Sequence, residues 1–176
     1  PNQILSLSLA RARKLARQGD SLQPLKSWSS AHPEDPVVRI ALAEMLSESG
    51  EIPAAIREYE AVLKLRPSDP ILMNNLASLY QRAGDGRALA LARRTHDLAG
   101  GVPQVADTYG WLLVQSGEAA KGLSVLQKAA QALPASAVIR YHLAVALVRT
   151  GSLQEARTLL EDLLLDPSEF EWRKEA

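Results

Sequence analysis

Residues 107–117 read DTYGWLLVQSG, which is the pattern of an α-helix with a glycine, Gly110, in its interior. Alanine would stabilise a helix at such a position by about 0.5–1 kcal/mol more than glycine does. A helix that keeps glycine there is expected to have a neighbouring helix close to its backbone. The rest of the chain identifies that neighbour, because the same kind of small residue recurs along it.

Small residues recur with a period of about 34. One series of glycines is spaced 34, 33 and 34 residues apart, and Gly110 belongs to a second series with the same spacing. A third series is spaced 33, 34 and 34. The three series are Gly50, Gly84, Gly117 and Gly151; Ala43, Ala77, Gly110 and Ala144; and Ala55, Ala88, Gly122 and Ala156. A period of this length indicates a helical repeat protein.

Each period has the pattern of two amphipathic helices. Asp35 and Asp69 each precede a proline, which predicts a capping carboxylate followed by proline at the first helical position. Ser136 can cap a helix in the same way, whereas Val102 cannot. The first helix of each unit should end at the recurring glycine. The second helix should run to a boundary proline, which is Pro33, Pro67, Pro134 or Pro167.

This pattern resembles the tetratricopeptide repeat, W-x2-L-G-x2-Y followed by A-x3-F and P. First-helix matches include Met73-x2-Leu76-Ala77-x2-Tyr80 and Ala106-x2-Tyr109-Gly110-x2-Leu113. The resemblance implies an all-α fold, a right-handed α-solenoid of about five helix-turn-helix repeats in a single domain over residues 1–176. We expect the repeats at about residues 3–35, 36–69, 70–102, 103–136 and 137–167, with a capping helix from residue 168.

In this repeat, Gly110 lies on a first helix and Gly122 on the second helix that follows it. Both occupy positions where the two helices approach closely. A leucine at either site should force the pair apart, at a cost of about 1–3 kcal/mol or more.

Composition and motifs exclude several functions. The chain has 20 Lys and Arg against 20 Asp and Glu, so it lacks the basic excess of a nucleic-acid-binding protein. It has no cysteine and no apolar run long enough for a membrane span. The histidines His32, His96 and His142 do not form a metal-binding spacing, and no HExxH, GxSxG, P-loop or GxGxxG motif occurs. We therefore expect no catalytic site, metal or cofactor, and hence no enzyme.

First helices line the concave surface of tetratricopeptide proteins, and their polar and aromatic residues are the candidate peptide-binding residues. Asn74 and Asn75 could bind a peptide backbone, or they could be solvated or cap a neighbouring helix. Trp111 could anchor a partner or cover a seam between repeats. Tyr141 and His142 could contact a partner or pack internally. The full candidate set is Asn74, Asn75, Ser78, Arg82, Asp107, Thr108, Trp111, Gln115, Tyr141, His142 and Arg149.

One class of partner can be excluded from the sequence. Tetratricopeptide domains that bind heat-shock chaperone C-termini use Lys, Asn and Arg on successive first helices to hold two carboxylates. Asn75 stands where the central Asn would be, but the flanking positions carry no cation. They are occupied by Ile40, Glu44, Gln104 and Thr108.

A more specific resemblance covers roughly residues 34–165. The stretches NNLASLYQ, RALALARRTHDLA, DTYGWLLVQSG and IRYHLAVALVRTGSLQEARTLLEDLL resemble the C-terminal region of bacterial tetratricopeptide lipoproteins of PEP-CTERM/exosortase protein-sorting and exopolysaccharide systems. This resemblance implies an envelope protein that faces the periplasm and is lipid-anchored through an upstream Cys. The chain opens PNQI without methionine, so we expect it to be part of a longer protein.

These observations predict a non-enzymatic scaffold that binds a protein or peptide segment in its concave groove. The envelope is the expected location, with a cytoplasmic location as the alternative. The alternative function is a structural spacer or a self-association module that forms weak homo-oligomers through its exposed repeat ends. Sedimentation over a concentration series separates the two functions, because self-association predicts a mass that rises with loading.

Overall fold

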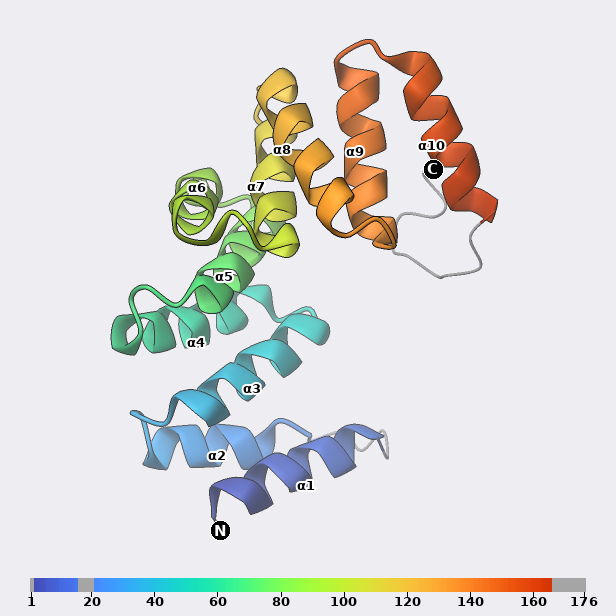
Figure 1. The fold of residues 1–176 in the computed structure, drawn as a ribbon. Helices are drawn as coiled ribbons and strands as arrows, with labels where there is room; N and C mark the ends of the chain where they lie inside the picture. Colours follow the sequence, from blue (N-terminus) through green and yellow to red (C-terminus); the bar gives the residue numbers. More distant parts are fainter. Residues whose placement is uncertain (1, 16–20, 166–176) are drawn as a thin grey trace. The chain divides into compact units, whose positions relative to one another are not determined.

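The computed structural model describes residues 2–15 and 21–165, and every regular element in these ranges is an α-helix (Figure 1). The expected all-α class is confirmed, since these ranges contain no strand. The expected capping helix from residue 168 lies outside the described residues. The chain divides into two compact units, Pro1–Asp85 (unit 1) and Gly86–Ala176 (unit 2). This division falls inside the expected third repeat, so the single domain stays a prediction.

Unit 1 consists of two helical hairpins and one further helix. Helices α1 and α2 form one hairpin, α3 and α4 form the next, and α5 packs on α4. Helix α2 also packs on α3, and the buried core of this unit includes Val38 and Val62. The helices are α1 (Gln3–Leu15), α2 (Gln23–Ala31), α3 (Pro36–Glu48), α4 (Ile52–Leu65) and α5 (Pro70–Arg82).

Unit 2 has the same parts in another order, with one helix followed by two hairpins. Helices α7 and α8 form a hairpin, as do α9 and α10, while α6 packs on α7 and α8 packs on α9. Its core includes a cluster of Val114, Leu126 and Ala146, against which Trp111 packs. The helices are α6 (Ala88–Ala99), α7 (Pro103–Gln115), α8 (Ala119–Ala132), α9 (Ala137–Arg149) and α10 (Leu153–Leu165).

The predicted N-terminal caps and turn glycines are confirmed, whereas the boundary proline Pro167 lies outside the described residues. Asp35, Asp69 and Ser136 accept hydrogen bonds from backbone N–H groups of the helices that they precede, at 3.0–3.4 Å, whereas Val102 provides no side-chain cap. The recurring turn glycines all adopt the left-handed backbone conformation that favours glycine. Their φ angles are 81° at Gly50, 67° at Gly84, 90° at Gly117 and 87° at Gly151.

The predicted close approach of α7 and α8 is also confirmed. A Cβ atom added to Gly122 would lie 2.7 Å from the carbonyl oxygen of Gly110 and 2.6 Å from Cγ2 of Val114. A Cβ atom added to Gly110 would lie 2.8 Å from Cγ of Leu126. Real Cβ contacts are longer than this, so a side chain at Gly122 would clash with the backbone of α7, and one at Gly110 would clash with the Leu126 side chain of α8.

Asp35 joins the first three helices. Its carboxylate caps α3 through the N–H groups of Val37 and Val38, and it accepts bonds from Trp28 Nε1 at 2.7 Å and Gln3 Nε2 at 2.9 Å. Burial raises the pKa of Asp35, but these four donors together lower it below its ordinary value of 3.8. The folded unit thus favours the ionised carboxylate, which links α1, α2 and α3 in one hydrogen-bond network.

Candidate functional site

A polar cleft of about 320 Å³ lies on unit 1 and is lined chiefly by the first helices α3 and α5. We call it the α3–α5 cleft. Three of the predicted binding residues, Asn75, Ser78 and Arg82, line it. The complete lining is Glu44, Ser47 and Glu48 from α3, Tyr59 from α4, and Asn75, Ser78, Leu79 and Arg82 from α5.

Hydrogen bonds within the unit hold the lining side chains in place. Asn75 Nδ2 donates to the Tyr59 hydroxyl at 3.1 Å. Burial raises the pKa of Tyr59, the Asn75 bond opposes this rise, and the negative charge of Glu44 adds to it. The Arg82 guanidinium donates to Ser47 Oγ at 2.7 Å and to the Ser47 carbonyl oxygen at 3.4 Å. The cleft therefore presents pre-positioned amide and guanidinium groups.

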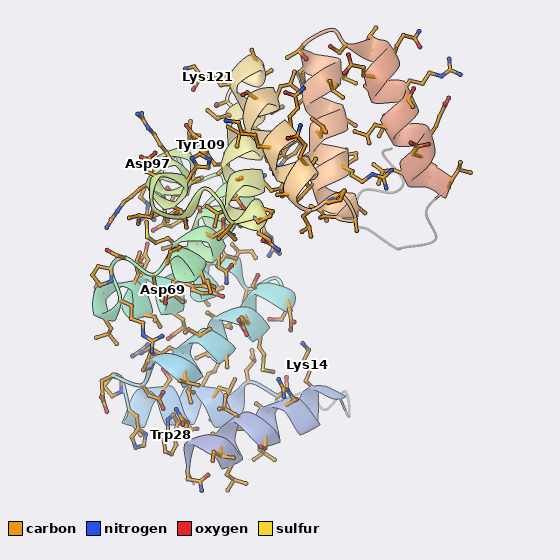
Figure 2. The ribbon with its side chains drawn as sticks, in the orientation of Figure 1. Lys14, Trp28, Asp69, Asp97, Tyr109 and Lys121 are labelled. Atoms are coloured by element: carbon orange, nitrogen blue, oxygen red, sulfur yellow. The ribbon has the colours of Figure 1, made fainter. Side chains whose placement is uncertain are left out.

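The charges around the cleft alternate from helix to helix. Glu44 is exposed and has no ion-pair partner among the residues that the structure describes, while Glu48 pairs with Lys14 of α1. Lys14 extends from α1 near its C-terminal end (Figure 2). A second cavity of about 460 Å³, which Arg11 and Lys14 help to line, shares Glu44 and Glu48 with the cleft. Acidic α3 thus lies between basic groups on α1 and the Arg82 side chain on α5.

Four predicted residues of unit 2 form a separate group, the Trp111 cluster of Asp107, Trp111, Tyr141 and His142. The Trp111 and His142 rings stack with centroids 4.2 Å apart and an interplanar angle of 11°. His142 Nδ1 lies 2.8 Å from Asp107 Oδ1, and the two residues are only 4% and 8% exposed. Tyr141 lies beside them, with its ring centroid 6.1 Å from that of His142.

The cluster connects two repeats, since Asp107 and Trp111 belong to α7 and His142 belongs to α9. Trp111 is half-buried and stacks on α9, as expected for a residue that covers a seam between repeats. Asp107 and His142 are also buried, and they contact each other inside the unit. Their direct role in binding a partner stays a prediction.

The remaining predicted residues lie apart from these two groups. Asn74 is half-buried, and its backbone carbonyl oxygen accepts a hydrogen bond from Ser78 Oγ at 3.2 Å. The Thr108 hydroxyl donates to the backbone carbonyl of the residue four positions before it, at 3.1 Å. Gln115 and Arg149 are exposed near the ends of α7 and α9.

Five of the eight lining residues were missing from the predicted set: Glu44, Ser47, Glu48, Tyr59 and Leu79. A signal existed for Tyr59, because it occupies the aromatic position of the A-x3-F pattern after Ala55, and a tyrosine there adds a hydroxyl group. No pattern in the sequence distinguishes Ser47, whose contribution depends on the Arg82 side chain of the following repeat.

In the described residues, no group of three or more His, Asp or Glu side chains could hold a metal ion. None of the helices within these ranges combines the length and apolar character that a membrane crossing requires.

Comparison with known families gives two matches. A model described as tetratricopeptide repeat matches residues 113–173, and a model described as TPR repeat matches residues 43–84. A curated relative, cellulose synthase 1 operon protein C of Komagataeibacter xylinus, is 26% identical over 136 residues. The match covers 73% of this chain and 10% of that protein, so the chain spans a small part of the relative's length.

Several solved structures have the same fold. A structure of MamA from Desulfovibrio magneticus RS-1 is 21% identical, with a TM-score of 0.73 and coverage of 90% of this chain and 93% of that chain. A thermophilic TPR protein of Thermus thermophilus is 18% identical, with a TM-score of 0.72 and coverage of 94% and 92%. A tetratricopeptide repeat protein from Parabacteroides merdae is 14% identical, with a TM-score of 0.80 and coverage of 94% and 66%.

Proposed function

Since the chain carries tetratricopeptide repeats, we propose that it is a non-enzymatic scaffold that binds a peptide or protein segment along the first helices of unit 1. The α3–α5 cleft carries this proposal. It combines a volume of about 320 Å³ with polar side chains that the unit itself holds in position. Such preorganisation lowers the entropy that a binding surface loses when a partner docks.

The lining suggests how a segment would bind. The side-chain amide nitrogen of Asn75 donates to the Tyr59 hydroxyl. The side-chain carbonyl oxygen of Asn75 can then accept a hydrogen bond from a peptide N–H group. Glu44 can pair with a basic side chain of the segment. The Arg82 guanidinium is fixed by Ser47, and no carboxylate of the described residues pairs with it, so it can bind an acidic side chain. Complementary charges of this kind fix the direction in which a segment binds.

We predict that Ser78→Trp, which fills the cleft, lowers capture of the partner from an extract of the cells that make this protein by at least about tenfold. Arg82→Glu should have a similar effect, because it replaces the positive charge of the guanidinium that Ser47 holds in position with a negative charge. Ser30→Trp is the matched control, since Ser30 is exposed on α2 outside the cleft. Capture is measured by quantitative mass spectrometry of the retained proteins, and unchanged melting temperatures confirm that the variants fold.

Equal capture by Ser78→Trp and Ser30→Trp would contradict binding in the cleft. A loss with both variants would point to a general effect of the added tryptophan, and would count against the cleft as the specific site.

We further propose that this scaffold acts in the bacterial envelope, lipid-anchored in the complete protein, in a protein-sorting or exopolysaccharide system. The resemblance to PEP-CTERM/exosortase lipoproteins supports this, as does the match to a cellulose synthase operon protein. The expected result is that the complete polypeptide sediments with membranes and that replacing its lipobox Cys releases it. Recovery of the unmodified polypeptide in the cytoplasmic fraction would contradict the proposal.

A further inference from the structure

The first helices of unit 1 can be aligned position by position. Helices α1, α3 and α5 begin at Gln3, Pro36 and Pro70. With these starts aligned, one small residue falls at the same place in all three helices and is buried in each. Its exposed fraction is 1% at Ala10, 0% at Ala43 and 0% at Ala77. Equivalent positions of the three helices can therefore be compared.

Two positions on α1 differ sharply from their equivalents. Both carry leucine in α1 and aliphatic residues in α3 and α5, so the chemistry is conserved between the repeats while the burial is not. The exposed fractions are 54% at Leu5 against 0% at Val38 and 3% at Leu72, and 40% at Leu9 against 3% at Leu42 and 1% at Leu76.

The neighbouring position serves as an internal reference. Ile4 is 73% exposed, but its equivalents Val37 and Ile71 are also exposed, at 47% and 71%. Exposure of Ile4 is therefore a property of the repeat, whereas exposure of Leu5 and Leu9 is particular to α1.

In the other repeats of unit 1, each first helix packs against a helix of the preceding repeat. Helix α2 packs on α3 and helix α4 packs on α5, so in each case the second helix of the preceding repeat lies against the first helix. Helix α1 packs against α2 and α3, both of which follow it in the chain. Beside Leu5 and Leu9 lies a mainly apolar groove of about 340 Å³, which Pro24 and Trp28 of α2 also line.

We propose that this groove is an interface for a further helical repeat of the same polypeptide, N-terminal to Pro1, whose second helix covers Leu5 and Leu9 as α2 covers α3. Terminal repeats of such arrays require a polar outer face, which leucines at these positions do not provide. The length of the curated relative, of which the match covers 10%, is consistent with additional repeats. This interface is separate from the α3–α5 cleft.

Hydrogen exchange tests the proposal by comparing the 176-residue chain with the complete polypeptide that its gene encodes. We expect the amides of α1 to exchange at least about tenfold more slowly in the complete polypeptide. Leu5→Glu combined with Leu9→Glu should return α1 to fast exchange in that polypeptide. Ile4→Glu is the matched control and should leave the exchange unchanged. Exchange in α4 and α5 of the same unit reports whether each variant still folds, and the single variant Leu5→Glu replaces the double one if it does not.

Equal exchange of α1 in the two proteins would overturn the proposal, as would a gene product that begins at Pro1. Sedimentation of the 176-residue chain tests the other occupant, a second copy. A mass that rises with concentration and falls back in the double variant, without extra α1 protection in the complete polypeptide, would assign the groove to self-association and also overturn the proposal.

Discussion

Gly122→Leu is expected to destabilise unit 2 by at least about 3 kcal/mol, more than ordinary overpacking of a core. Even the first atom of the new side chain would lie 2.7 Å from the Gly110 carbonyl oxygen and 3.1 Å from the Val114 backbone nitrogen. These are backbone atoms, so the clash can be relieved only by separating α7 from α8. Urea denaturation followed by far-UV circular dichroism measures the loss as a lower midpoint.

Alanine variants of Gly122 and Gly110 show which of the two glycines tolerates a side chain less well. Gly122→Ala should cost more than Gly110→Ala, because the Cβ atom at Gly110 meets mainly the Leu126 side chain, which can rotate away. Gly101→Ala is the control, since a Cβ atom there would have no neighbour within 4 Å, and its effect should stay within about 0.5 kcal/mol. Stabilisation by Gly122→Ala, the usual effect of alanine in a helix, would show that the backbones can separate at little cost.

The helices and their ends were predictable because local chemistry determines them. A capping carboxylate before proline, as at Asp69, and a glycine in the left-handed region, as at Gly50, act within a few residues of the chain. The Gly110–Gly122 approach was predictable for a different reason. The repeat places small residues at equivalent positions in every unit, and this pattern indicates a close helix pair without any knowledge of its neighbours.

The candidate sites were only partly predictable, because they depend on contacts between repeats. The sequence places Asn75 on a first helix, but the hydroxyl group that orients it comes from Tyr59 of the preceding repeat. Asp107 and His142 are 35 positions apart, and each has the polar character of a surface residue when considered alone. Their pairing becomes evident only when α9 packs on α7, since a period does not show which polar positions the next repeat covers.

Asp107→Ala is expected to destabilise unit 2 by about 2–4 kcal/mol, because it removes a buried acceptor 2.8 Å from His142 Nδ1. Asp107→Asn keeps an acceptor oxygen and should cost less. Fluorescence of Trp111 should also change, since its ring stacks on that of His142.

The neighbouring variant Thr108→Ala provides the control for Asp107→Ala. Within the described part of the chain, the Thr108 hydroxyl bonds to the backbone of its own helix alone, so its loss should lower the free energy of unfolding by less than about 1 kcal/mol. Urea denaturation of the three variants then distinguishes packing from recognition. If Asp107→Ala left stability unchanged but abolished partner capture, the Trp111 cluster would be a binding site. A large loss of stability with capture retained by Asp107→Asn would instead identify the pair as a structural contact between repeats.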